Sequence, residues 1–118
     1  MRTVIFAMPY IGGVLSVNHY KHKGGIYTKR EVKNWMDALA LLDNSKLRGK
    51  KVRFPVIIHI HGLFKDKRVP DLANLHKVVG DALEVALDIN DKHFRFVDEG
   101  YMIDKGRLPE LIIGIEVE

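Results

Sequence analysis

The order of apolar and polar residues predicts a strand, a turn and a loop in the first part of the chain. An apolar run from Thr3 to Met8 is typical of a strand. The stretch from Pro9 to Gly13 then predicts a turn. The polar stretch from Ser16 to Gly25 follows and ends in a glycine pair, which indicates a hairpin or a loop.

The middle of the chain combines a helical pattern with a strand pattern. Thr28 followed by Glu31 forms a capping box, which predicts a helix from Lys29 onward. Apolar residues recur at helical spacing as far as Asp43–Asn44, where this helix is expected to end. From Val52 to His61 apolar residues occupy every second position instead, which predicts a strand with one buried face.

A second helix is predicted from Asp71, its N-cap after a proline, to about Asp88. A helical wheel places seven apolar residues on its buried face: Leu72, Leu75, Val78, Val79, Ala82, Val85 and Ala86. Two more strands are expected, from His93 to Val97 and from Leu111 to Val117. The chain is therefore expected to form a single α+β domain, residues 1–118, in which a mixed four- to five-stranded sheet packs against two helices.

Composition narrows the class of protein further. The apolar fraction of 47% and the charged fraction of 29% are those of a folded globular protein, and 118 residues suffice for one core. The absence of cysteine excludes disulfides and Cys-ligated zinc, and it favours a reducing, cytoplasmic setting. No run approaches the roughly 20 apolar residues that cross a bilayer, so no membrane partner is expected.

Positive charge is concentrated in three segments, within residues 19–33, 46–53 and 65–68. The chain has 19 Lys and Arg against 15 Asp and Glu, a formal net charge of +4. Clustered cations are what binding to a phosphate backbone requires, although such runs are also common in solvated loops. Charge alone therefore favours a negatively charged partner only modestly.

Acidic residues bracket the second predicted helix. Asp71 stands at its start and Asp91 follows its end, while Lys77 and Asp81 lie along its polar stripe. Mg²⁺ is held by one or two carboxylates together with phosphate oxygens and water, so this set predicts a magnesium site at which Lys77 steadies a phosphate or the attacking water. Spacing alone favours structural roles instead: an N-cap at Asp71, an i,i+4 ion pair between Lys77 and Asp81, and a turn at Asp91.

Two other features allow more than one interpretation. His59 and His61 share a strand face and so form a candidate pair of metal ligands, but no third ligand is evident and a polar sheet surface is favoured. Gly80 lies within the second helix, where glycine costs up to about 1 kcal/mol against alanine. A close approach to the backbone at Gly80, by another helix, a partner subunit or DNA, is therefore expected.

The stretch DLANLHKVVGDALEVALDINDKHF resembles the core of the RusA-like Holliday junction resolvases, in which an Asp-x-Asp-Asn-Leu-x-Lys run opens a helix and a further Asp follows it. The earlier stretch SVNHYKHKGGIYTKREVKNW is similar to the N-terminal region of that family. The resemblance implies a RusA-like fold and a homodimeric endonuclease that resolves four-way or other branched DNA in recombination and repair. It also implies Mg²⁺ or Mn²⁺ as the cofactor.

Carried over by position, the resemblance implies a catalytic set and a metal site. Asp71, Lys77 and Asp91 form the catalytic set. Asp71 and Asp91 are the metal-binding carboxylates, with Asp81 as an additional ligand. The residues placed at or near DNA are Asn18, His19, Lys21, Asn74 and His76.

One departure from the family motif leaves an alternative open. The second aspartate of the motif is Ala73 here, and Asn90 stands where a neighbouring acid is expected. The alternative function is a branched-DNA-binding module that no longer cleaves.

The symmetry of the substrate predicts assembly. Paired cuts in a four-way junction need two sites, whereas one chain offers a single candidate site, so a homodimer is expected. Thr3 to Met8 and Leu111 to Val117 are candidate contact edges.

Overall fold

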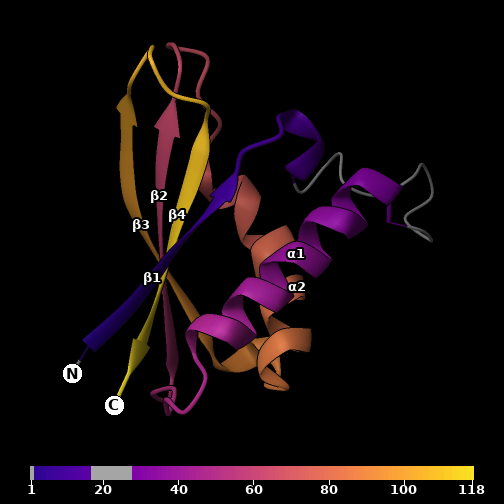
Figure 1. Ribbon diagram of the computed structural model, residues 1–118, viewed down its shortest axis with the longest axis vertical. Coiled ribbons are helices and arrows are strands. Elements are labelled where there is room, and N and C mark those ends of the chain that lie inside the picture. Colours follow the sequence, from indigo (N-terminus) through magenta and orange to yellow (C-terminus); the bar gives the residue numbers. More distant parts are fainter. Residues whose placement is uncertain (1, 17–27) are drawn as a thin grey trace.

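The computed structural model describes residues 2–16 and 28–118, which form a four-stranded sheet with two helices on one side (Figure 1). The strands are β1 (Arg2–Pro9), β2 (Val56–Phe64), β3 (Phe94–Ile103) and β4 (Glu110–Val117). The helices are α1 (Arg30–Lys46) and α2 (His76–Leu87), and the short 3-10 segments are η1 (Gly13–Leu15), η2 (Leu72–Leu75) and η3 (Asp91–His93). The α+β class and the mixed sheet with two helices are confirmed. Within the described ranges, no helix is long and apolar enough to cross a membrane.

The strand order β1-β4-β2-β3 makes α2 a crossover connection. β4 is antiparallel to both β1 and β2, whereas β2 and β3 run parallel, with Val56 opposite Phe94. Parallel neighbours need a crossover, and the segment η2–α2–η3 supplies it on the helical side of the sheet. Asp71 therefore lies at the start of the crossover and Asp91 near its end.

The core lies between the two helices and the face of the sheet that they cover. Its largest fully buried side chains are Leu15, Leu39, Ile58, Ile60, Leu75, Leu83, Leu111, Ile113, Ile115, Val32 and Val56. Trp35 of α1 joins the helix to β1, because its indole Nε1 donates a hydrogen bond to the carbonyl of Pro9 at 2.7 Å. Side chains on the opposite face of the sheet range from exposed, as Ile5 is at 62%, to half-buried, as His59 is at 26%.

The ends of several elements differ from the predictions, and α1, for example, continues beyond Asp43–Asn44 to Lys46. The prediction of a capping box at Thr28 and Glu31 is wrong. The N-cap of α1 is Lys29, and its side chain makes no capping hydrogen bond. β2 begins at Val56 instead of Val52, because Pro55 has no N–H to donate to a strand ladder and Phe54 is 61% exposed. β3 continues beyond Val97 to Ile103.

The second predicted helix begins with a 3-10 segment, and this rotates its buried face. Leu83 is fully buried although the wheel left it out, whereas Val85 is 77% exposed although the wheel placed it inside. A 3-10 helix has about three residues per turn instead of 3.6, so η2 shifts the phase of every later residue.

Candidate active site

Asp71 lies at the point where the chain leaves the loop after β2 and enters η2. Its Oδ1 accepts a hydrogen bond from the backbone N–H of Ala73 at 3.0 Å, so its role as an N-cap is confirmed. The residue is exposed, and within residues 2–16 and 28–118 its Oδ2 makes no hydrogen bond. This second oxygen fits a hard cation that takes most of its other ligands from water and phosphate.

Lys77 and Asp81 lie one turn apart on α2. Lys77 Nζ is 3.2 Å from Asp81 Oδ1, which confirms the i,i+4 ion pair. The Lys77 side chain is 49% exposed and that of Asp81 is 23% exposed. Exposed pairs of this kind contribute about 0.2–0.5 kcal/mol, so a phosphate can displace Asp81 from Lys77 at little cost.

Asp91 is at the other end of the crossover, where it opens η3. Its backbone N–H donates to Glu84 Oε2 at 2.8 Å, which ties it to the C-terminal half of α2. α2 has 12 residues and is therefore about 18 Å long. Since Mg²⁺ binds oxygen at about 2.1 Å, Asp71 and Asp91 of one copy do not reach the same ion. In the described part of the chain, no three His, Asp or Glu side chains are placed to hold a metal.

His76, the first residue of α2, contacts a strand residue that the sequence analysis did not select. Its Nε2 lies 2.8 Å from Asp98 Oδ1 of β3, and its ring stacks on Phe96 with centroids 4.3 Å apart and an interplanar angle of 9°. Asn74 lies in η2, and its backbone N–H donates to the carbonyl of Asp71 at 3.0 Å. No sequence motif indicated Asp98, because it meets His76 only through the packing of α2 on β3.

Within the described residues, strand β3 and not another helix approaches Gly80, while an approach by a partner subunit or by DNA stays a prediction. A Cβ at Gly80 would lie 3.5 Å from Cζ of Phe96, so the phenyl ring of β3 packs against the backbone of α2. This contact is an ordinary van der Waals distance and does not by itself require glycine.

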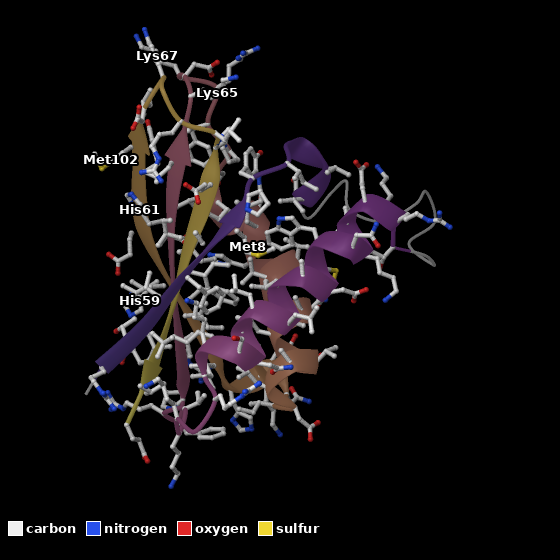
Figure 2. All side chains as sticks on the ribbon, viewed as in Figure 1. Met8, His59, His61, Lys65, Lys67 and Met102 are labelled. Atoms are coloured by element: carbon white, nitrogen blue, oxygen red, sulfur yellow. The ribbon has the colours of Figure 1, made fainter. Side chains whose placement is uncertain are left out.

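Basic side chains gather where β2 ends, at the tip that leads into Asp71. Figure 2 shows Lys65 and Lys67 projecting from this tip. Lys105 borders the same hollow as Lys67 and Arg68. Arg68 pairs with Asp66 at 2.8 Å and holds the pKa of that carboxyl down at about 2. The tip therefore presents cations in the segment that precedes Asp71, and clustered cations are what binding to a phosphate backbone requires.

The predicted DNA contacts Asn18, His19 and Lys21 lie outside the described residues and stay predictions. The family resemblance is the basis for assigning them.

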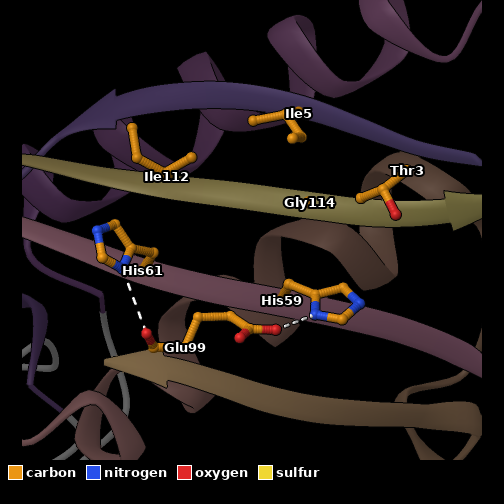
Figure 3. A pocket seen from close by; sticks show the side chains of 7 residues that line it. All are labelled: Thr3, Ile5, His59, His61, Glu99, Ile112 and Gly114. Atoms are coloured by element: carbon orange, nitrogen blue, oxygen red, sulfur yellow. Dashed lines mark hydrogen bonds and ion pairs between the residues drawn. The ribbon is translucent and has the colours of Figure 1, made fainter. Parts of the chain in front are cut away.

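A second hollow lies on the face of the sheet opposite the helices (Figure 3). Its lining includes His61, Ile112 and Gly114. His59 Nδ1 is 2.6 Å from Glu99 Oε1, and its Nε2 is 2.7 Å from Glu116 Oε2. Hydrogen bonding to Glu116 raises the pKa of His59, Glu99 adds to this effect, and burial opposes it. Both imidazole nitrogens are thus occupied by carboxylates, which agrees with a polar sheet surface and not with a His59–His61 metal site.

The fold and this motif-bearing crossover define the class of protein. The family model described as "Endodeoxyribonuclease RusA" matches residues 15–116. The chain therefore belongs to the RusA endodeoxyribonuclease family, the family of Holliday junction resolvases.

The other comparisons add little. No curated protein matches the chain in a sequence search. Among solved structures, one match is to "Structure of 2C-Methyl-D-erythritol-2,4-cyclodiphosphate Synthase", with 15% identity and a TM-score of 0.33. That match covers 78% of this chain, and the chain spans 55% of the length of that structure. A likeness of this size carries no argument about function.

Proposed function

We propose that the protein is a metal-dependent endodeoxyribonuclease that cuts four-way or other branched DNA at a site built on Asp71 and Lys77. One observation carries the proposal: the exposed carboxylate of Asp71 opens the crossover helix that bears the Asn-Leu-x-Lys run, in a chain that matches its family over residues 15–116. Asp71 and Lys77 lie on this crossover, which follows the lysine-rich tip along the chain.

Each of these residues has a separate role in the proposed hydrolysis of the phosphodiester. Asp71 would hold the cation with the carboxylate oxygen that is not used in the fold, since its Oδ1 accepts from the backbone N–H of Ala73. The cation, Mg²⁺ or Mn²⁺, would supply Lewis-acid chemistry to the phosphate and to the attacking water. Lys77 exchanges its weak pairing with Asp81 for the charge that develops on the phosphate. Lys65 and Lys67 bind the backbone of one DNA arm.

The active form is proposed to be a cytoplasmic homodimer. Two copies related by a two-fold axis supply the two sites that paired cuts require. Because α2 separates Asp71 from Asp91 within one copy, Asp91 joins an Asp71 site only when it comes from the second copy. Asp81, which is already paired with Lys77, is left as an outer ligand through water.

The test is cleavage of a labelled four-way junction in Mg²⁺, in Mn²⁺ and in EDTA. The unaltered protein is expected to cut only with a divalent cation, and Asp71→Asn to lower the rate by on the order of 10²-fold or more. Asp37→Asn is the matched control, since Asp37 is an exposed α1 residue paired with Lys33. Equal cutting by the Asp71 and Asp37 variants would contradict the assignment.

A second candidate function is a branched-DNA-binding module without cleavage. It is favoured by Ala73, which removes one carboxylate from the motif, and by the lack of a three-ligand metal group among the described residues. This candidate predicts junction binding with a salt slope set by the number of phosphates contacted, and no product in any divalent cation. Metal-dependent nicking at sub-stoichiometric protein would exclude it.

A further inference from the structure

We infer that His76 and Asp98 form a catalytic dyad, in which His76 removes the proton from the water that attacks the DNA phosphate and Asp98 orients it. This inference rests on the proposed nuclease function. It adds to that function a general base that the family resemblance does not supply.

The contact between the two side chains leaves one imidazole nitrogen for substrate. His76 Nε2 lies 2.8 Å from Asp98 Oδ1, so an Nε2–H donates to the carboxylate and Nδ1 keeps its lone pair. Both side chains are accessible, at 30% for His76 and 35% for Asp98. In the described part of the chain, Nδ1 has no hydrogen-bond partner. A histidine held by a carboxylate, with its second ring nitrogen unpaired, is an arrangement suited to a general base.

The ring is also fixed in orientation by packing. Phe96, two residues before Asp98 on β3, stacks almost parallel to the imidazole of His76. The far edge of the Phe96 ring rests against the backbone of α2 at Gly80. Stacking and the bond to Asp98 together hold His76 at the junction of η2 and α2, five residues after Asp71. Groups held in this way lose little freedom when substrate binds.

The dyad compensates for the carboxylate that the site lacks because Ala73 replaces the second aspartate of the motif. A site with one fewer carboxylate holds its cation less tightly and activates water less strongly. In the proposed step, the water proton passes to His76 Nδ1 while the water oxygen forms a bond to phosphorus. The bond from phosphorus to the leaving ester oxygen breaks, and that oxygen takes a proton from solvent. Asp98 stabilises the imidazolium until it returns its proton to water.

Imidazole rescue tests the step directly. Under single-turnover conditions with Mg²⁺, His76→Ala is expected to cleave a four-way junction about 10²-fold more slowly, and free imidazole to restore much of the rate. Junction affinity measured in EDTA should change less than about twofold, since a general base contributes little to binding. Asp98→Asn should slow cleavage by about tenfold without imidazole rescue. His61→Ala, on the opposite face of the sheet, is the control and should be unaffected.

A measurement without metal tests whether His76 carries its proton on Nε2, as the dyad requires. Two-bond ¹H–¹⁵N spectra of the unaltered protein should show the proton of His76 on Nε2, and Asp98→Asn should disturb this tautomer. Cleavage at the normal rate by His76→Ala, or equal losses of cleavage and affinity with no rescue, would overturn the dyad. His76→Gln, with lowered rate and normal affinity, serves the same purpose if His76→Ala does not fold. If Asp71→Asn abolishes cutting while His76→Ala cuts normally, the proposed nuclease function is supported and the His76–Asp98 dyad is wrong. If the unaltered protein does not cut at all, both the nuclease function and the dyad are wrong.

Discussion

Asp71 and Asp91 stand at opposite ends of one crossover, with the whole of α2 between them. Both belong to the set of residues that the family resemblance selects, yet one copy of the chain does not bring both to one ion. A shared ion therefore needs Asp91 from a second copy.

Mixing two inactive variants tests this arrangement. A heterodimer of Asp71→Asn and Asp91→Asn chains contains one site with both carboxylates if each site draws Asp91 from the partner, and none if each site is built from one chain. We expect each variant alone to be inactive and the mixture to nick one strand of a four-way junction. Activity in neither the separate nor the mixed samples would contradict a site in which Asp91 comes from the partner chain.

Gly80 provides a test of the packing between α2 and β3. An alanine Cβ would lie 3.5 Å from Cζ of Phe96, an ordinary contact, so only the helical preference of the backbone should change. Gly80→Ala is expected to raise the free energy of unfolding by up to about 1 kcal/mol, as measured by denaturant titration. Gly80→Leu should instead lower it by about 1–3 kcal/mol, because the longer side chain would displace Phe96. Destabilisation by alanine would contradict the ordinary contact distance between this Cβ and Phe96.

Periodicity predicts the order of the elements because each element has one face in the core. Val56, Ile58 and Ile60 alternate along β2 and all are fully buried. The extension of β3 beyond Val97 was not predictable in this way, since burial does not alternate along its exposed second half. Its partner β2 holds it instead, through hydrogen bonds that leave no pattern in the sequence.

The candidate site was predictable only where a motif is local. Asp71 and Lys77 lie six residues apart on one crossover, and the sequence alone selects both. Asp98 reaches His76 across 22 residues, and Glu116 reaches His59 across 57. Pairs of this kind depend on strand order, so only the folded chain reveals them.

His59 should titrate above its ordinary pKa of 6.5, chiefly because of Glu116. A raised folded pKa contributes stability that is present in full below about pH 6.5 and is lost as pH rises through the folded value. Glu116→Gln is therefore expected to lower the pKa of His59, followed by NMR, and to flatten the fall in stability above neutral pH. Glu118→Gln, on a neighbouring exposed residue, is the control. An unchanged His59 pKa in the Glu116 variant would contradict the assigned cause.

Asp43 of α1 is the buried charge that should most affect stability. The residue is fully buried, and neither carboxylate oxygen has a hydrogen-bond partner among the described residues. Burial raises the pKa of Asp43 from 3.8 to about 6. Between these two values the folded chain binds the proton more tightly than the unfolded chain, so this residue's contribution to stability falls as pH rises.

Replacing Asp43 with asparagine isolates that contribution. At neutral pH, Asp43→Asn should raise the free energy of unfolding by up to about 3 kcal/mol, since each pKa unit corresponds to about 1.4 kcal/mol. Below about pH 3 the carboxyl is largely protonated in both states, because this lies under the unfolded pKa of 3.8, so the advantage of the variant should largely disappear. Urea titrations of both proteins at several pH values measure the difference directly, and other carboxylates cancel in it. A difference that stays constant across this range would mean that the Asp43 carboxyl is charged and stabilised in the folded protein.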